Sequence, residues 1–246
     1  MCLIAWNWQP TSTLPLVLLS NRDEFYQRPT LPLHWWDTTT NGSRVLAGKD
    51  LQAGGTWLGI TARGRLAALT NYRATAPQRM DAPSRGALVA DFLQSTLSAE
   101  AYLQTLAPQV HEYNPFNLLV FDGLVLVGLE SRGAKIVKMI PGIGAVSNAD
   151  FQTPWPKLQR LTTGLQTTSS LMPLLHDRTL AADSDLPATG VALELERALS
   201  AVFIATPAYG TRACSVVKVG RDTAEFTEES WGSDGLSGTA TERFSW

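Results

Sequence analysis

The chain opens, directly after Met1, with the stretch Cys2-Leu3-Ile4-Ala5-Trp6-Asn7-Trp8. A second apolar stretch, Leu16-Val17-Leu18-Leu19-Ser20, follows a turn between Pro10 and Pro15. Short apolar stretches rich in aromatic and branched side chains are typical of β-strands. Side chains alternate across a strand, so Cys2 shares a face with Ile4, Trp6 and Trp8. The sequence therefore predicts that two strands begin the fold and that a cysteine lies at the start of the first.

Working outward, the rest of the chain continues this strand pattern with two helical interruptions. Strands are predicted at 44–48, 55–61, 65–71, 117–121, 124–129, 134–140, 144–147, 214–219, 224–228 and 239–244. Helices are predicted at 84–93, from an N-cap at Ser98, at 155–168 and at 191–203, while 21–42 is expected to be irregular. Hairpin signals such as Asp122-Gly123 dominate over strand–helix–strand alternation. This favours an α+β fold of antiparallel sheets with helices outside them, in a single domain over 1–246.

Composition excludes several classes of protein. The 246 residues include 20 Lys+Arg, 22 Asp+Glu and two cysteines, and 44% are hydrophobic. The near balance of charge argues against nucleic-acid binding, and two cysteines cannot form a disulfide framework. No apolar run reaches the roughly 20 residues of a membrane helix, and residues 1–20 contain no basic residue of a secretory signal. We expect a cytoplasmic protein with a small-molecule partner, and the oligomeric state stays open.

Familiar catalytic signatures are absent from the sequence. There is no P-loop, no H-E-x-x-H and no G-x-S-x-G, and Gly142-Ile143-Gly144 lacks the third glycine of a dinucleotide fingerprint. The three histidines, His34, His111 and His176, are not at metal-ligand spacing. We therefore expect no metal and no tightly bound cofactor.

The position of Cys2 suggests a different chemistry. A small penultimate residue normally permits removal of Met1, which would leave Cys2 at the N-terminus. Its α-amine, with a pKa of about 7.7–8.0, could then accept the thiol proton, so that one residue supplies both nucleophile and base. The alternative is a buried strand cysteine without chemistry, a common use of this residue.

Several sequence blocks, taken in order, resemble the NRDE family, which is also called the transport-and-Golgi-organisation-2 family. The blocks are Asn21-Arg22-Asp23-Glu24, Gly54-Gly55-Thr56-Trp57-Leu58-Gly59, Thr70-Asn71-Tyr72-Arg73, Ser147-Asn148, Thr153-Pro154-Trp155-Pro156-Lys157 and Tyr209-Gly210-Thr211-Arg212. The resemblance runs from position 2 to about 217. It implies an N-terminal-nucleophile (Ntn) hydrolase-like fold, a four-layer αββα sandwich. Eukaryotic members are linked to Golgi organisation and haem trafficking.

A more distant resemblance, to N-terminal-cysteine amidases such as penicillin V acylase and bile salt hydrolase, implies roles for individual residues. Cys2 matches the nucleophile and Asp23 the aspartate that orients the α-amine. Asn71 and Asn148 match amide donors to an oxyanion or to the α-amine, and Arg212 a cation that lowers the thiol pKa. The pattern departs at Ser20, which stands where those amidases have an arginine.

A ligand pocket beside Cys2 is expected from the N-terminal third of the chain, which holds eight arginines and five of the eight tryptophans. We assign substrate binding to Arg22, Trp6, Trp57, Tyr72 and Arg73, so that an apolar body with an anionic end would fit. Packing between the sheets is the alternative for both tryptophans.

Two functions remain open from the sequence. The first is an amidohydrolase of a non-peptide C–N bond that acts through Cys2. The second is a non-catalytic carrier of haem or a lipid-like anion, with axial ligands from His34, Cys2, His111 or His176 and arginines on the propionates. Trp35 and Trp36, beside His34, are expected on a flap over the pocket.

Overall fold

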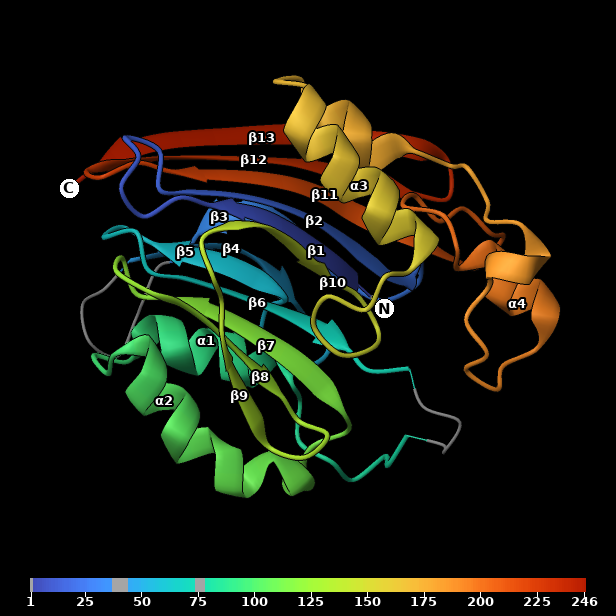
Figure 1. Cartoon of the computed structure of the whole chain (residues 1–246), viewed down its shortest axis with the longest axis horizontal. Coiled ribbons are helices and arrows are strands. Elements are labelled where there is room, and N and C mark those ends of the chain that lie inside the picture. Colours follow the sequence, from blue (N-terminus) through green and yellow to red (C-terminus); the bar gives the residue numbers. More distant parts are fainter. Residues whose placement is uncertain (1, 37–43, 74–77) are drawn as a thin grey trace.

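The apolar strands of the sequence pair into two antiparallel sheets that stack face to face between helices. The computed structural model describes residues 2–36, 44–73 and 78–246, and Figure 1 shows the layers. The first sheet has the order β10-β1-β2-β11-β12-β13. Its strands are β1 (Cys2–Trp8), β2 (Leu16–Phe25), β10 (Gly142–Val146), β11 (Tyr209–Val219), β12 (Thr223–Gly232) and β13 (Gly235–Ser245).

The second sheet is built from consecutive strands of the chain and has the order β3-β4-β5-β6-β7-β8-β9. Its strands are β3 (Thr30–Trp35), β4 (Val45–Asp50), β5 (Leu58–Thr61), β6 (Leu66–Asn71), β7 (Phe116–Phe121), β8 (Leu126–Glu130) and β9 (Lys135–Lys138). Asp122 closes the predicted hairpin between β7 and β8, because its carboxylate accepts the backbone N–H groups of Leu124 and Val125.

Helices cover the outer face of each sheet. They are α1 (Gly86–Gln94), α2 (Ala99–Leu106), α3 (Pro156–Thr167), α4 (Leu193–Ala198) and the 3₁₀ helices Ala107–Glu112, Met172–His176 (η2) and Asp183–Asp185. Helices α1 and α2 pack on the second sheet and α3 on the first, so the predicted four-layer αββα sandwich is confirmed (Figure 1). No helix among residues 2–36, 44–73 and 78–246 is both long and apolar enough to cross a bilayer.

The alternation predicted for the first strand decides which core each side chain joins. Ile4, Trp6 and Trp8 lie in the core between the sheets, whereas Leu3 and Ala5 lie in the core beneath α3. Each face of β1 is therefore buried against a different layer, and Cys2 begins the strand at the edge of the inter-sheet face.

Two segments differ most from the predicted elements, and several strand ends differ by up to five residues. The segment 21–42 was expected to be irregular, yet β2 continues to Phe25 because β11 pairs with it as far as Tyr209, and β3 follows. The predicted helix 191–203 is only the short α4. Beyond it the chain bonds elsewhere, since the backbone N–H of Phe203 donates to the carbonyl of Asp177.

The aromatic flap expected beside His34 is not present. Trp35 belongs to β3 and its ring packs edge-on against Phe244, with 5.0 Å between ring centroids. The Trp36 indole N–H donates to the Ala47 carbonyl at 3.3 Å. Both rings are therefore held against neighbouring strands.

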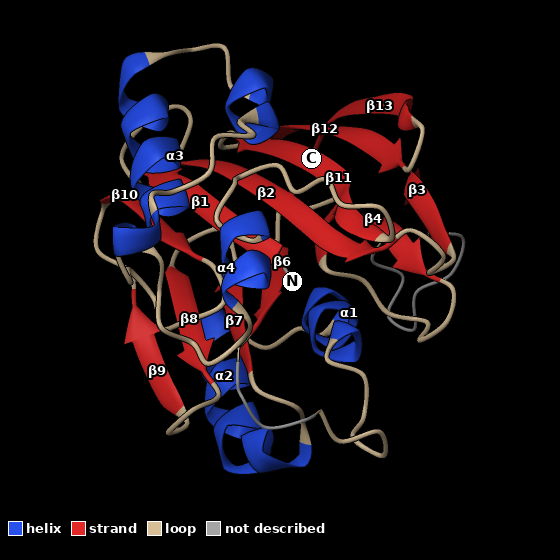
Figure 2. Cartoon of the chain, turned by 90° about the vertical axis from the view of Figure 1, so that its right-hand side faces the viewer, coloured by secondary structure: helices blue, strands red, loops and turns tan. Residues whose placement is uncertain are grey.

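The glycines around Trp57 bring α1 close to the second sheet. A Cβ on Gly55 would lie 2.4 Å from the carbonyl carbon of Gly86, so the two backbones approach each other closely here. At Gly59, β4, β5 and β6 keep a regular register. A Cβ on Gly59 would meet Leu93 of α1 at 2.7 Å. This packing places the start of α1 beside the end of the sandwich where β1 begins (Figure 2).

Candidate functional site

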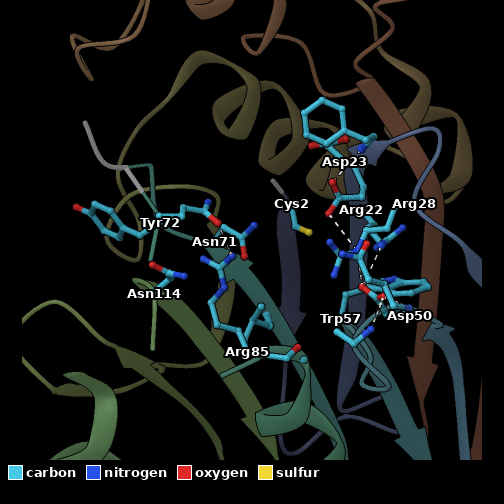
Figure 3. A pocket seen from close by; sticks show the side chains of 18 of the residues that line it. Cys2, Arg22, Asp23, Arg28, Asp50, Trp57, Asn71, Tyr72, Arg85 and Asn114 are labelled. Carbon is cyan, nitrogen blue, oxygen red and sulfur yellow. Dashed lines mark hydrogen bonds and ion pairs between the residues drawn. The ribbon is translucent and has the colours of Figure 1, made fainter. Parts of the chain in front are cut away.

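A cavity opens at the end of the sandwich where β1 begins. Its volume is about 800 Å³, and both sheets, the start of α1 and the α4 region contribute to its wall. Among its lining residues are Cys2, Arg22, Asp23, Glu24, Arg28, Asp50, Trp57, Leu69, Asn71, Tyr72, Arg73, Arg85, Asn114, Leu195, Leu199 and Tyr209. Figure 3 shows the Cys2 thiol between Arg22 on one side and Asn71 on the other.

Cys2 is held by its main chain while its thiol faces the cavity. The main-chain carbonyl accepts hydrogen bonds from Ser147 Oγ at 3.0 Å and Asn148 Nδ2 at 3.4 Å. Burial raises the pKa of the thiol and the Asp23 carboxylate adds to this, whereas Arg22 and the backbone N–H of Asp23 favour the thiolate. The group is therefore a thiol that needs a base before it can act as a nucleophile.

Asp23 lies beside Cys2 because β1, β2 and β11 end together. Cys2 is opposite Arg22 in the register of β1 and β2, and Asp23 is opposite Thr211 in the register of β2 and β11. Thr211 Oγ1 donates to Asp23 Oδ1 at 2.7 Å. Burial raises the pKa of Asp23, while Lys157, Thr211 and Arg22 oppose this. The main-chain oxygen of Asp23 accepts a hydrogen bond from the Tyr209 hydroxyl at 2.9 Å.

The two asparagines have different environments. Asn71 ends β6 on the cavity wall, where an amide donor would meet an atom bound at Cys2 (Figure 3). Asn148 instead donates its side-chain amide to the carbonyls of Asn71, at 2.8 Å, and of Cys2. Asn148 therefore ties the ends of the two sheets together, and of these two asparagines Asn71 alone lines the cavity.

Arg212 is not brought to Cys2. The register between β2 and β11 shifts between Thr211 and Ala213, which leaves Arg212 as the extra residue of a bulge. Its guanidinium donates to the carbonyls of Phe25, Tyr26, Arg28 and Trp231. It fastens the strand ends from outside the cavity, and Arg22 takes the place near the thiol that we had expected for Arg212.

Arg22 and Asp23 are neighbours on β2 and point to opposite faces of the strand, yet both line the cavity. Its guanidinium lies over the Trp57 ring, 4.5 Å from the centroid, and 3.6 Å from Asp50 Oδ2. Arg28 Nε donates to the same carboxylate at 2.7 Å. The departure at Ser20 therefore does not leave the thiol without a cation, because Arg22 at the next cross-strand position supplies one.

Of the other predicted binding residues, Trp57, Tyr72 and Arg73 line the cavity, whereas Trp6 does not. Trp6 is buried between the sheets, where its ring packs edge-on against Phe151. Arg73 is buried as well: it pairs with Glu196 at 2.5 Å and lies over the Trp155 ring. The Tyr72 ring lies beneath the Arg132 guanidinium.

None of the three histidines, all of which are among the described residues, lines this cavity. His34 Nδ1 is 2.7 Å from the Pro32 carbonyl on β3, and His176 Nε2 is 2.6 Å from Glu229. His111 is exposed at the end of the 3₁₀ helix Ala107–Glu112. Of the predicted haem ligands, Cys2 alone lies in the cavity. Met1, whose removal the nucleophile mechanism requires, lies outside the described residues.

The sequence analysis assigned no role to Arg85, which lines the cavity, or to Lys157, which lies behind its wall. Arg85 stands directly before α1, and its guanidinium donates to the Pro115 carbonyl at 3.1 Å and faces Asn71 (Figure 3). Burial lowers its pKa, while Cys2 and Glu24 oppose this. Its only sequence signal is its place before Gly86, and that does not show which strand end the helix will approach.

Lys157 is the second missed residue and lies behind Asp23. It is fully buried on α3 and donates to the Leu199 carbonyl at 3.1 Å. Burial lowers its pKa to about 8, and Asp23 is the main group that opposes this. Lys157 therefore belongs to the buried charges that set the state of the Asp23 carboxyl, although it does not line the cavity.

Comparison with known proteins identifies the family. The family model described as "Transport and Golgi organisation 2" matches residues 1–233. This chain belongs to the transport and Golgi organisation 2 family. It is 36% identical over 267 residues to the Bos taurus "Transport and Golgi organization protein 2 homolog", covering 95% of each chain. It is 33% identical to the Homo sapiens homolog of the same name, covering 94% of this chain and 93% of that one.

A solved structure supports the fold independently of the family. The C2A mutant of conjugated bile acid hydrolase from Clostridium perfringens superposes with a TM-score of 0.50, covering 100% of this chain and 97% of that chain. Only 8% of the aligned residues are identical, so the likeness concerns the Ntn-hydrolase fold. This chain and that hydrolase therefore share the sandwich architecture that the sequence predicted.

Proposed function

We propose that this member of the family is an N-terminal-nucleophile amidohydrolase that cleaves a non-peptide C–N bond through Cys2. The observation that carries the proposal is the position of Cys2 at the wall of an 800 Å³ cavity, with Asp23 and Asn71 on either side. The fold shared with a conjugated bile acid hydrolase supports it, since that protein is named for hydrolysis of a conjugate.

The chemistry begins with removal of Met1, which frees the α-amine of Cys2. That amine takes the proton from the thiol as the sulfur attacks the amide carbonyl, so a C–S bond forms and the carbonyl oxygen becomes negative. Asn71 donates to this oxygen, and Asp23 holds the α-ammonium. The ammonium then protonates the departing amine as the C–N bond breaks. Water finally hydrolyses the thioester, which releases the acid and restores the thiol.

The cavity favours a substrate with an apolar body and an anionic end. Leu69, Leu195 and Leu199 supply apolar wall, while Arg28 and Arg85 supply charge. Arg85 is the better anchor for a carboxylate. Arg28 already pairs with Asp50, and no carboxylate of the described residues forms an ion pair with Arg85. Arg85 therefore retains charge to offer a ligand.

The state of the N-terminus tests the mechanism most directly. Intact-mass spectrometry of protein purified from its native host should find Met1 absent, and incubation with an activated acyl amide should add one acyl mass at Cys2. Retention of Met1 would contradict the mechanism, because the α-amine base would lie on the wrong residue. Acylation of Cys214 in place of Cys2 would contradict it as well.

Ligand binding without turnover is the second candidate, and one observation favours it. A cavity of about 800 Å³ that is lined by Cys2 and by several arginines would accommodate a large anionic ligand without any reaction at the thiol. Haem would then meet Cys2 as its axial ligand, with arginines near the propionates. Titration with haem should give a saturable shift of the Soret band that Cys2→Ala abolishes. A spectrum that Cys2→Ala leaves unchanged would exclude axial ligation in this cavity.

A further inference from the structure

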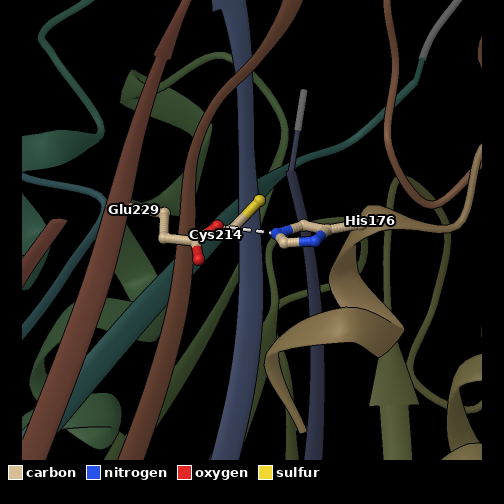
Figure 4. A group of neighbouring side chains, drawn as sticks. All are labelled: His176, Cys214 and Glu229. Atoms are coloured by element: carbon tan, nitrogen blue, oxygen red, sulfur yellow. Dashed lines mark hydrogen bonds and ion pairs between the residues drawn. The ribbon is translucent and has the colours of Figure 1, made fainter. Parts of the chain in front are cut away.

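Three metal-ligating side chains converge on the far face of the first sheet, away from the Cys2 cavity. Cys214 of β11 and Glu229 of β12 are directly opposite each other in the strand register, so their side chains lie on the same face. His176, the last residue of η2, lies over both. The donor atoms of these three residues all lie within 4.8 Å of one another (Figure 4).

The surrounding structure holds this arrangement in place. Asn21 pairs with Cys214 from the other side, and its side-chain amide donates to the carbonyls of Leu175 and Val202, both at 2.9 Å. These bonds fasten η2 to the sheet. The His176 ring packs edge-on against Trp231, with 5.4 Å between centroids. A buried polar anchor and aromatic packing thus fix both the helix and the ring.

The donor set suits a zinc ion. Imidazole nitrogen, thiolate sulfur and carboxylate oxygen are the three side-chain ligand types of Zn²⁺, with bond lengths of about 2.0–2.3 Å. Tetrahedral geometry at those lengths separates the donors by about 3.4–3.6 Å. His176 Nε2 and Glu229 Oε2 are 2.6 Å apart, and no donor pair exceeds 4.8 Å. Side-chain shifts of about 1 Å would therefore complete three corners of a tetrahedron.

The charges around Cys214 also favour a cation. The Glu229, Asp23 and Glu228 carboxylates all lie near enough to act electrostatically on this thiol. A dication would compensate for one thiolate and one carboxylate beside a neutral imidazole. Binding releases the thiol proton, and the imidazole proton if it is charged, to solvent.

We propose that His176, Cys214 and Glu229 form a Zn²⁺ site whose fourth position is taken by water. Access is through His176, whose side chain is 35% exposed, while Cys214 closes the site from beneath. The site lies on the opposite face of β11 from the core between the sheets, so it does not depend on the chemistry at Cys2.

Titration with Co²⁺, a spectroscopic substitute for zinc, tests the proposal. Untagged protein freed of metal with a chelator should bind about one Co²⁺ per chain with a near-ultraviolet sulfur-to-metal charge-transfer band. Added Zn²⁺ should displace it. Cys214→Ser should abolish the band, and Cys2→Ala, the matched cysteine control, should leave it unchanged. A band that is lost in Cys2→Ala and kept in Cys214→Ser would overturn the assignment.

Cys214 is buried, so Cys214→Ser could fail to fold. A variant of His176, the more exposed ligand, therefore provides a second test. His176→Gln should weaken Zn²⁺ affinity by more than the 10–100-fold that loss of an outer-shell partner typically costs. Its circular dichroism spectrum should match that of the parent. Unchanged affinity in folded His176→Gln, or the absence of saturable binding in the parent protein, would refute the site.

Discussion

The two cysteines lie on neighbouring parts of one sheet, yet their surroundings differ in almost every respect that matters for chemistry. Cys2 begins β1, is 7% exposed and faces a cavity, whereas Cys214 lies within β11 and is fully buried beneath the helical layer. Burial raises the pKa of both thiols. At Cys2 the Asp23 carboxylate adds to that effect, but the Arg22 guanidinium and the Asp23 backbone N–H oppose it, whereas at Cys214 three nearby carboxylates add to it.

The difference teaches that burial alone does not decide what a cysteine can do. A thiol beside a cation, at the edge of a sheet and next to a cavity, needs only a base to become a nucleophile. A thiol among carboxylates is kept protonated and becomes useful only when a metal replaces its proton. The following predictions are ordered by size, and each challenges one side of this contrast.

The largest expected effect separates the two cysteines by turnover. Cys2→Ala should lower amidase activity by on the order of 10⁴-fold or more, since it removes the thiol that attacks the substrate. Cys214→Ser should leave kcat within about twofold of the parent value in metal-free buffer. Steady-state kinetics on one activated amide measure both. Equal loss in the two variants, with native circular dichroism, would erase the proposed contrast.

The second prediction compares an asparagine from each environment. Asn71→Ala should lower kcat by about 10²–10³-fold with little change in stability, because it removes an amide donor to the developing oxyanion. Asn21→Ala should lower the free energy of unfolding by about 2–3 kcal/mol, because two buried carbonyls lose their donor. Urea denaturation and kinetics on both variants separate the roles.

A control for Asn71 is available on the same wall. The Asn114 amide is engaged with the backbone of Arg79, donating to its carbonyl and accepting its N–H, both at 2.8 Å. Asn114→Ala should therefore leave kcat nearly unchanged. If it lowers kcat as much as Asn71→Ala does, general disruption of the wall would explain both results better than oxyanion binding.

The third prediction concerns Glu228, a carboxylate between the two regions. Burial raises its pKa from 4.5 to about 7, while the Leu33 N–H and the Ser215 hydroxyl oppose this. The folded state binds the proton more tightly than the unfolded state does. This contribution to stability is therefore complete below about pH 4.5 and lost as the pH rises through 7. Glu228→Gln should remove this pH dependence. At pH 8–9 its free energy of unfolding should be up to about 3 kcal/mol higher than that of the parent protein.

Glu225 on the same strand offers a control of opposite sign. Hydrogen bonds from Lys218 and Arg243 lower its pKa, so its contribution is present above about pH 4.5 and is lost as the pH falls. Urea denaturation from pH 4 to pH 9 should show a pH dependence that Glu228→Gln flattens near neutrality and Glu225→Gln flattens only in acid. Identical profiles for Glu228→Gln and the parent protein would contradict a buried carboxyl that titrates near pH 7.

The smallest expected effect is on thiol reactivity. Iodoacetamide should alkylate Cys2 of the processed protein and leave Cys214 unmodified on the same timescale. Arg22→Gln should slow the reaction of Cys2 at pH 8 by about tenfold, since the cation that favours the thiolate is lost. Peptide mapping by mass spectrometry measures both sites. Faster modification of Cys214 than of Cys2 would reverse the contrast.

The sequence by itself determined the local features of this protein. Alternation of apolar residues places Ile4, Trp6 and Trp8 on one face of β1, Asp122-Gly123 closes a hairpin, and the Ser98 hydroxyl caps α2 by accepting the N–H of Ala101. These features depend on residues a few positions apart, so the sequence pattern contains them. The antiparallel sheets followed from the same patterns and the candidate nucleophile from its position after Met1, whereas the four-layer sandwich followed from the resemblance of the ordered motifs to a family.

Only the tertiary structure decided which distant residues meet. The bulge at Arg212 arises from the pairing of strands almost 190 residues apart, and it turns that guanidinium away from Cys2. Arg85 reaches the cavity because Gly55 lets α1 approach the sheet. His176 meets Cys214 because Asn21 fastens η2. Strand register, a bulge and close packing act between segments far apart in the chain, and spacing within the sequence carries no record of them.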